Sequence, residues 1–398
     1  MKSIPVDSLK AGMAFDKPVY IDRNNMLVDA KEAISQSDID RLKKWNIKEI
    51  QTTGIEIQAE IVKNDSKAQN TQEKIDLEKI IKRLKETSRY RETFFEVMQE
   101  GEELVHVAYD SITHEKPFQI SRIRTLAENI VTILDKGPDS FMYLYYDKRA
   151  ETVGRHVMAV SVFSIVLAEA LQISKPRIIE LVFSILLMDI GMMLLPTSII
   201  EKSDKLTDAE KAKVHAHPLQ GYQLLTQTAK VKNSIASVAL EHHEHFDGSG
   251  YPRHIKGTEM SDYTKIAAIC DSFAALLESK AYRGPELPYR AMKELLTLGI
   301  YRYDPIYLKS FLDRLSIYPI GSIVKLSDNS MGIVAGHVTG KPMRPVILIV
   351  RDTEGHRPSD PTFVHLLYHT EKYISQALDP EEALLDLALE ITHFTEKL

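Results

Sequence analysis

Two stretches of the chain are apolar on most sides of a helix. Residues 155–173 read RHVMAVSVFSIVLAEALQI and residues 262–279 read DYTKIAAICDSFAALLES, and neither stretch contains an internal proline or glycine. Helices with this pattern are usually buried in the core of a protein. The pattern therefore predicts two core helices inside a helical domain, to which we assign residues 149–316.

A third apolar run, LVFSILLMDIGMMLLPTSII over residues 181–200, is almost long enough to cross a bilayer. Asp189, Gly191 and Pro196 argue against a membrane span, and a central aspartate costs about 2.5–3.5 kcal/mol on insertion scales. We therefore expect a buried helix and no membrane span. Because an unpaired buried carboxylate is costly, Asp189 is expected to have a partner.

The beginning of the chain is expected to form a small module over residues 1–62. Within it, residues 33–54 read as a helix capped by Ser35 or Ser37, followed by a turn and a short strand. This pattern predicts an α/β module ahead of the helical domain.

Residues 63–148 are expected to be a linker and a helical region. The segment 63–74 is polar, with Ala68 as its only apolar side chain, and predicts a solvated linker. From residue 75 onward, isoleucine, leucine and phenylalanine recur near helical spacing, which predicts charged helices up to the core domain.

The last part of the chain, residues 317–398, has a different pattern of apolar and turn-forming residues. Residues 321–338 and 344–352 contain β-branched runs broken by Asp-Asn and glycine, which predict short strands and hairpins. A last helix is expected to begin with Asp379 as its cap and Pro380 at its first position. The whole pattern predicts a mainly α fold, a helical bundle with a β-containing C-terminal tail.

Composition narrows the classes of function. The chain has 398 residues and a formal net charge of −6, which gives no electrostatic footprint for DNA or RNA. Cys270 is the only cysteine, so no intramolecular disulfide can form. The first residues lack the long apolar segment of a secretory signal, and we expect a cytoplasmic protein.

Histidine and aspartate residues recur through the helical core, each about one helix and its connection after the last. A bundle can bring one side chain from each helix to a common point, as bundle metal sites do. Imidazole and carboxylate together suit Fe, Mn, Zn or Ni, and a carboxylate that bridges two metals about 3.5–4 Å apart suits phosphoester cleavage. A metal would thus be the partner of Asp189. The candidate ligands are His156, Asp189, His217, His242, His243 and Asp271.

Each of these residues also has an ordinary interpretation when taken alone. His156 can be a hydrogen-bonded core or surface histidine, and Asp271 can cap a helix or pair with a lysine. His242 and His243 can close a solvated helix end, since adjacent side chains point about 100° apart on a helix. The combination of all six favours the metal site.

The segment HHEHFDGSGYP, residues 242–252, resembles the HD-GYP family at every fixed position of the family's HHE-x-x-DGSGYP motif. This family comprises bacterial phosphodiesterases that act on cyclic di-GMP. HPLQGY, residues 217–222, is similar to the family's HP-x-x-G. The resemblance covers about 150–285 and extends more weakly to a β-rich tail at 318–337 and a small N-terminal module at 4–15.

The resemblance implies an HD-domain bundle with two metal positions. One would take His156, the residue at position 188, Asp189 and Asp271. The other would take Asp189 together with the three histidines at 217, 242 and 243. In the family's HD-x-GK motif the first position is histidine and the last is lysine, whereas this chain has Met188 and Met192. The first metal position has lost a nitrogen ligand, and a thioether is a soft ligand that suits Mn or Fe poorly.

A second departure follows Asp271, where the family reads D-x-[FY]-DA-[LM]-TS-x-R-x-YR. Ala274, Leu277 and Glu278 replace an acid, a threonine and a serine. Lys280 replaces an arginine, which keeps the charge but loses the two-pronged grip on phosphate. The resemblance assigns ligand binding to Gly250, Tyr251, Pro252, Lys280 and the retained Arg283.

The sequence therefore predicts a degenerate HD-GYP protein of bacterial cyclic di-GMP signalling. We expect it to bind metal, nucleotide or both, with weak or absent phosphodiesterase activity and Asp189 as the central catalytic-site residue. We expect one divalent transition metal per chain, with two as the alternative. A GGDEF-type diguanylate cyclase domain and a second copy of the chain are candidate partners. An active metal-dependent phosphodiesterase is the alternative function, and a scaffold without metal or nucleotide is a third.

Overall fold

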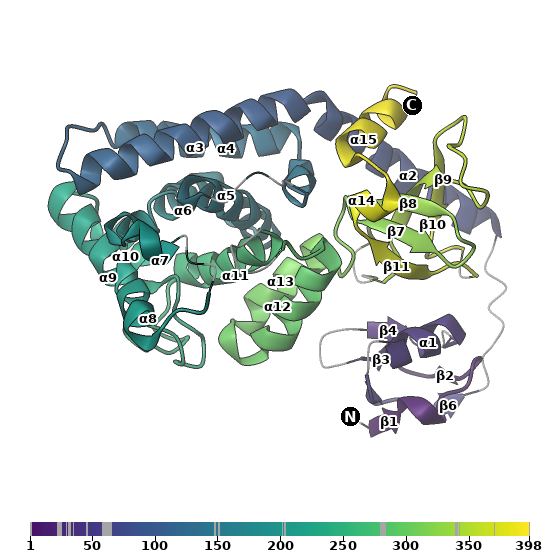
Figure 1. The fold of residues 1–398 in the computed structure, drawn as a ribbon. Coiled ribbons are helices and arrows are strands. Elements are labelled where there is room, and N and C mark those ends of the chain that lie inside the picture. Colours follow the sequence, from purple (N-terminus) through teal and green to yellow (C-terminus); the bar gives the residue numbers. More distant parts are fainter. Residues whose placement is uncertain are drawn as a thin grey trace.

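The computed structural model describes most of the chain and places it in three parts (Figure 1). The described residues are 2–21, 26–28, 30, 33–34, 36–44, 47–57, 66–146, 149, 152–200, 202, 204–278, 284–338, 341, 343–369 and 371–397. A helical domain lies beside a C-terminal sheet, and the N-terminal module lies next to that sheet. The expected mainly α fold with small sheets near both ends is confirmed.

The N-terminal module has a small core of its own. It contains one four-stranded sheet in the order β1-β5-β3-β4, a β2-β6 pair and one α-helix. The expected helix, turn and strand are present, but Ser37 lies inside the helix and Ser35 lies outside the described residues. The elements are β1 (Lys2–Pro5), a 3-10 helix (Val6–Ser8), β2 (Ala14–Phe15), β3 (Val19–Tyr20), β4 (Met26–Val28), α1 (Gln36–Lys44), β5 (Glu49–Thr52) and β6 (Glu56–Ile57).

Three long helices connect this module to the core. They are α2 (Ser66–Arg89), α3 (Arg91–Thr113) and α4 (Ser121–Lys136). The prediction of a solvated linker over 63–74 is wrong from Ser66 onward, because α2 begins there. The segment is polar but rich in lysine, glutamine and glutamate, which are good helix formers. Arg83 of α2 is tied to the core, since its Nε donates to the buried carboxylate of Asp139 at 2.9 Å.

The helical domain packs around α5 and α11, the two helices that the apolar pattern predicts. Its elements are a 3-10 helix (Ser140–Leu144), α5 (Val153–Ala170), α6 (Lys175–Ile185), a 3-10 helix (Ile190–Leu194), α7 (Thr197–Ile200), α8 (Asp208–His215), α9 (His217–Gln223), a π-helical turn (Leu224–Thr228), α10 (Asn233–Glu241), α11 (Asp262–Leu277), α12 (Pro288–Arg302) and α13 (Pro305–Leu315).

The expected single helix over 181–200 is divided into three pieces in the structure. The chain leaves α6 after Ile185, turns at Asp189 into a 3-10 helix, and begins α7 after Pro196. A side chain at Gly191 would place its Cβ 2.1 Å from the carbonyl oxygen of His217. Only glycine therefore allows this turn to approach α9 so closely.

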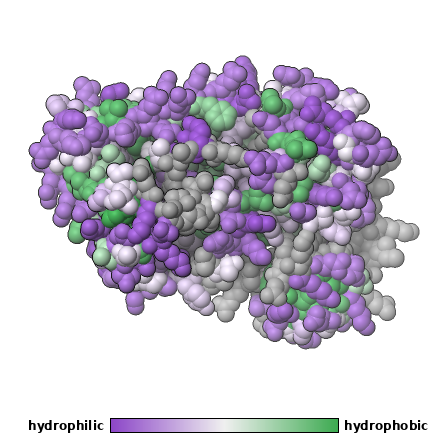
Figure 2. Space-filling view, viewed as in Figure 1, coloured by the Kyte–Doolittle hydropathy of each residue, from purple (hydrophilic) through white to green (hydrophobic). Residues whose placement is uncertain are grey.

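Among the described residues, one helix is long and apolar enough to cross a membrane, and it is α5. In the structure, 72% of this 18-residue helix is buried inside the protein, as expected for a core helix. The outer face seen in Figure 2 is mostly hydrophilic with scattered apolar side chains, which is ordinary for a folded protein.

The C-terminal part is a five-stranded antiparallel sheet in the order β10-β9-β8-β7-β11. The expected last helix begins as predicted, because Asp379 accepts a hydrogen bond from the backbone of Glu381. It is broken at Leu384, whose φ of +53° is left-handed, so two helices replace the one expected. The elements are β7 (Ile323–Leu326), β8 (Met331–Gly336), β9 (Val346–Arg351), β10 (Thr362–His365), β11 (Ile374–Leu378), α14 (Pro380–Ala383) and α15 (Leu387–Thr395).

Candidate metal centre

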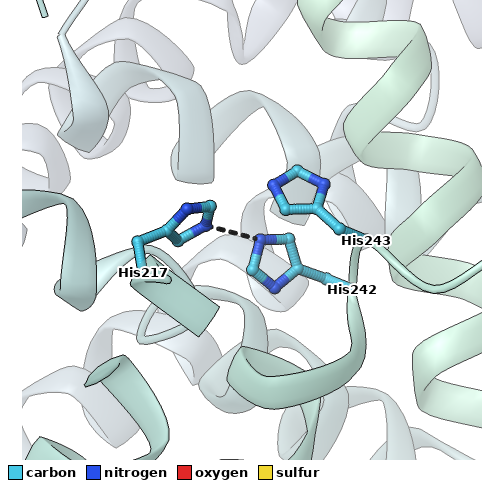
Figure 3. A group of neighbouring side chains, drawn as sticks. All are labelled: His217, His242 and His243. Carbon is cyan, nitrogen blue, oxygen red and sulfur yellow. Dashed lines mark hydrogen bonds between the residues drawn. The ribbon is translucent and has the colours of Figure 1, made fainter. Parts of the chain in front are cut away.

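Three histidine rings meet at the ends of two short helices (Figure 3). His217 is the first residue of α9, while His242 and His243 directly follow α10. One ring nitrogen from each histidine lies within 4.8 Å of the others, and the Nε2 atoms of His217 and His242 are 3.3 Å apart. The three rings therefore face a common point.

Asp189 faces the same point from the 3-10 turn. Its Oδ1 is 3.3 Å from Nε2 of His217 and 3.5 Å from Nε2 of His242. Backbone carbonyls hold the opposite side of both rings. Nδ1 of His217 donates to the carbonyl of Val214 at 2.7 Å. Nδ1 of His242 donates to the carbonyl of Ala239 at 3.0 Å. A carbonyl only accepts, so Nδ1 carries the hydrogen and Nε2 is the nitrogen that faces Asp189.

The remaining two predicted ligands close the other side of the site. His156 lies in the first turn of α5, where the Thr152 side chain caps the helix by accepting from the Arg155 backbone. Nε2 of His156 is 2.8 Å from Oδ1 of Asp271 and 3.9 Å from Oδ2 of Asp189. Nδ1 of His243 is 3.7 Å from Oδ2 of Asp271. The fold thus brings all six predicted ligands together.

Glu278 also belongs to this site, although in the sequence it stands out only as a departure from the family pattern. Its carboxylate oxygens are 2.9 and 3.1 Å from Nδ1 of His156. Glu278 directly follows α11, and its seven-residue spacing from Asp271, about two helical turns, was the available signal in the sequence.

Met188 and Met192 lie beside these ligands but differ in their environment. Met188 is 0% exposed and belongs to the main hydrophobic core, whereas Met192 is half-buried. Methionine fills irregular gaps in a core well. The fold therefore accommodates a thioether at the position that is histidine in the resembled family.

The loop that contains Gly250 and Tyr251 packs directly on the histidines. The Tyr251 backbone donates to the carbonyl of His243 at 3.1 Å, and its ring stacks on His215 with centroids 3.9 Å apart. A Cβ at Gly250 would lie 2.3 Å from the backbone nitrogen of His245, so only glycine fits there. Pro252 follows Tyr251 in the same loop. The predicted ligand-binding residues Lys280 and Arg283 lie outside the described residues.

Buried charge governs the ionisation of the site. Burial alone would raise the pKa of Asp189, but hydrogen bonds and charges of His217 and His242 outweigh it and hold the pKa well below its usual range. Burial and the neighbouring His242 lower the pKa of His243 well below normal. Burial alone would lower the pKa of His156, yet Glu278 and Asp271 outweigh it and raise that pKa well above normal. The site therefore combines charged carboxylates with at least one neutral imidazole.

The donor set fits a divalent transition metal. Asp189, His217, His242 and His243 supply one carboxylate and three imidazoles, a combination suited to Fe, Mn, Zn or Ni. The opposite group of His156, Asp189 and Asp271 supplies one imidazole and two carboxylates. The group of Asp189 and the three histidines, which we call the three-histidine half, offers three nitrogen ligands, whereas the opposite group offers one.

Comparison with known proteins identifies two family models in the chain. The HD domain model matches residues 143–306, and the model of a KOW domain associated with HD domains matches residues 323–385. The first match contains every predicted ligand, and the second contains all five strands of the C-terminal sheet.

Several curated proteins resemble the chain over the same region. It is 30% identical over 210 residues to the cyclic di-GMP phosphodiesterase PA4108 of Pseudomonas aeruginosa, which covers 52% of this chain and 50% of that protein. It is 33% identical over 159 residues to a cyclic di-GMP phosphodiesterase of Thermotoga maritima, covering 40% of this chain and 43% of the relative. The chain spans about half the length of these two relatives.

A solved structure, that of Bd1817, a HDG"Y"P protein from Bdellovibrio bacteriovorus, aligns over 78% of this chain and 98% of that one. The identity is 16% and the TM-score is 0.48.

Proposed function

The chain belongs to the HD-GYP family, and from that premise we propose that it binds one divalent transition metal tightly and takes cyclic di-GMP, with weak or absent phosphodiesterase activity. The observation that carries this proposal is a difference between the two halves of the site: one has its full set of ligands, and the other has lost a nitrogen ligand. Asp189 lies within 3.5 Å of both His217 and His242, whereas the neighbouring Met188 fills the core with a thioether.

The three-histidine half supports metal binding. Backbone carbonyls hold Nδ1 of His217 and His242, so both Nε2 atoms are turned towards Asp189 before any ligand arrives. Such outer contacts of ligating histidines commonly matter 10–100-fold for metal affinity. A bound transition metal supplies Lewis-acid polarisation of a phosphoryl oxygen and lowers the pKa of water.

The opposite half supports weak turnover. Met188 removes one nitrogen ligand, and Met192 provides no cation where negative charge develops on a scissile phosphate. Loss of one preorganised stabilising group commonly costs about 2.7–4 kcal/mol of barrier. The two losses affect the same reaction step, so turnover should fall far more than binding.

The nucleotide is inferred from the family and from the relatives. Relatives of this chain are named for action on cyclic di-GMP, and the Tyr251 loop packs against His243 at the edge of the site. Ring centroids of Tyr251 and His243 are 4.8 Å apart. A GGDEF-type domain or a second copy of the chain would act as a partner to this nucleotide-binding form.

An active phosphodiesterase is the second candidate function, favoured by one observation. His156, Asp189 and Asp271 still converge, so donors for a second metal are present despite Met188. The two candidates differ in turnover once metal is supplied.

The test uses the full chain, purified after growth with added Mn or Fe. Elemental analysis should find about one tightly held metal per chain. Calorimetry should show cyclic di-GMP binding that is lost in His242→Ala, and chromatography should show little pGpG or GMP. Glu103, which is exposed on α3, provides the control Glu103→Ser. Rapid turnover by the unaltered protein would replace the first function with the second, and no metal with no nucleotide binding would refute both.

A further inference from the structure

Glu278 contacts a predicted metal ligand from the side that faces away from the metal centre. Both of its carboxylate oxygens are within 3.1 Å of Nδ1 of His156. The side chains of the pair are each 11% exposed, so water competes little for this contact. Glu278 is the first residue after α11, the helix that also carries Asp271.

We propose that Glu278 is a positioning residue that orients His156 and thereby preserves a second, weaker metal position in this chain. This inference rests on the proposed function only in assuming that the three-histidine half holds the tighter metal. The weaker position would use His156, Asp189 and Asp271.

The geometry of the His156 ring supports the orienting role. A carboxylate accepts hydrogen bonds, so Nδ1 of His156 donates to Glu278 and Nε2 is the nitrogen turned towards Asp271 and Asp189. A carboxylate on the far nitrogen of a ligating histidine fixes its tautomer and ring plane and raises its basicity as a ligand. Without Glu278, the described contacts hold the ring only from its metal-facing side.

The contact between Glu278 and His156 depends on a residue that differs from the family pattern. Where the family pattern has a serine at position 278 and a histidine at position 188, this chain has Glu278 and Met188. A serine side chain is two bonds shorter and carries no charge. Stronger orientation of the remaining imidazole offsets part of the affinity lost with the missing one.

The experiment titrates the metal-free full chain with Mn²⁺ and resolves tight and weak classes of site. Glu278→Ser should weaken the weak class by about 10–100-fold and leave the tight class unchanged. Glu278→Gln keeps an acceptor oxygen at the same reach and should recover part of the loss. Glu103→Ser serves as the matched control, because Glu103 is exposed on α3.

A double-mutant cycle separates orientation of His156 from a general structural effect. In the background of His156→Ala, Glu278→Ser should cause no further loss of Mn²⁺ affinity, since the residue acts through that ring. Nitrogen-15 NMR of labelled histidine in the Zn²⁺-loaded protein, assigned with His156→Ala, should show a weaker Nδ1–H hydrogen bond in Glu278→Ser.

Three results would overturn the proposal: a tight class of Mn²⁺ site with no weak class beside it, an unchanged weak class in Glu278→Ser, or a full further loss in the double variant. Absence of the tight class instead would refute the proposed function, so the two failures are distinguishable.

Discussion

Restoring the family residues at two methionines should convert this protein into a faster phosphodiesterase. The double variant combines Met188→His with Met192→Lys. The first adds a nitrogen ligand next to Asp189, and the second puts a cation where charge develops on the phosphate. We expect the double variant to cleave cyclic di-GMP at least ~100-fold faster than the parent, which corresponds to about 2.7 kcal/mol of barrier.

The structure sets both the magnitude and the risk. One preorganised stabilising group is worth about 2.7–4 kcal/mol, so the cation alone would account for the increase if the metal position were complete. Either substitution alone should give little, because ligand and cation serve one transition state and act non-additively. Met188 is fully buried, so an imidazole without a metal there costs about 1–3 kcal/mol, whereas half-buried Met192 lets a lysine extend towards water.

The assay is the release of pGpG and GMP, measured by chromatography after metal loading. Circular dichroism and melting must first show that the variants fold. Met188→His with Met193→Lys is a matched control, because Met193 is half-buried on the same 3-10 turn and gives the same change in composition. This prediction is wrong if the parent already turns over at a rate that the double variant does not exceed, or if the control variant gains as much activity.

The remaining predictions concern metal, packing and pH. His242→Ala should abolish the tightly held metal in elemental analysis, whereas His156→Ala should leave it in place; two tight metals in the parent would contradict the role given to Met188. Chelation should lower the melting temperature, since free metal at 100 times its Kd contributes about 2.7 kcal/mol, and an unchanged value after verified removal would mean that Asp189 is balanced by protein groups alone. Gly191→Ala should reduce metal content, because its Cβ would lie 2.1 Å from the His217 carbonyl oxygen; unchanged metal binding in calorimetry would show that the turn can move at no cost. Burial alone would raise the pKa of Asp139, but the hydrogen bond and charge of Arg83 outweigh burial and lower this pKa. The ionised Asp139 carboxylate therefore stabilises the fold at pH values above its unfolded pKa. This stabilisation is lost as the pH falls through the lower pKa of the folded state. Melting followed from pH 6 to pH 3 should therefore fall less steeply in Asp139→Asn than in the parent.

The fold could be predicted where burial leaves a periodic trace in the sequence. The two core helices are confirmed because most of their positions are apolar, and the C-terminal strands because β-branched runs alternate with turn residues. The linker expected over 63–74 is instead the start of a helix, since polar residues with good helix propensity look alike in both settings. The break after Ile185 was also missed, and the close approach of Gly191 to α9, where a Cβ would lie 2.1 Å from the His217 carbonyl oxygen, is a tertiary contact that the apolar pattern does not show.

The candidate ligands could be chosen from residue type and spacing, but their orientation could not. Which nitrogen of His217 or His242 faces Asp189 is decided by backbone carbonyls at 2.7 and 3.0 Å, and every residue has such a carbonyl. Glu278 was overlooked for the opposite reason, since comparison with a family pattern presents it as a loss of serine. Its meaning depends on where the end of α11 meets the start of α5, a tertiary contact between residues 122 positions apart. A substitution that breaks a motif can therefore add a contact to the same site. The departures at Met188 and Glu278 must be judged from the contacts that these residues make in the structure, and not from the number of motif positions that are lost.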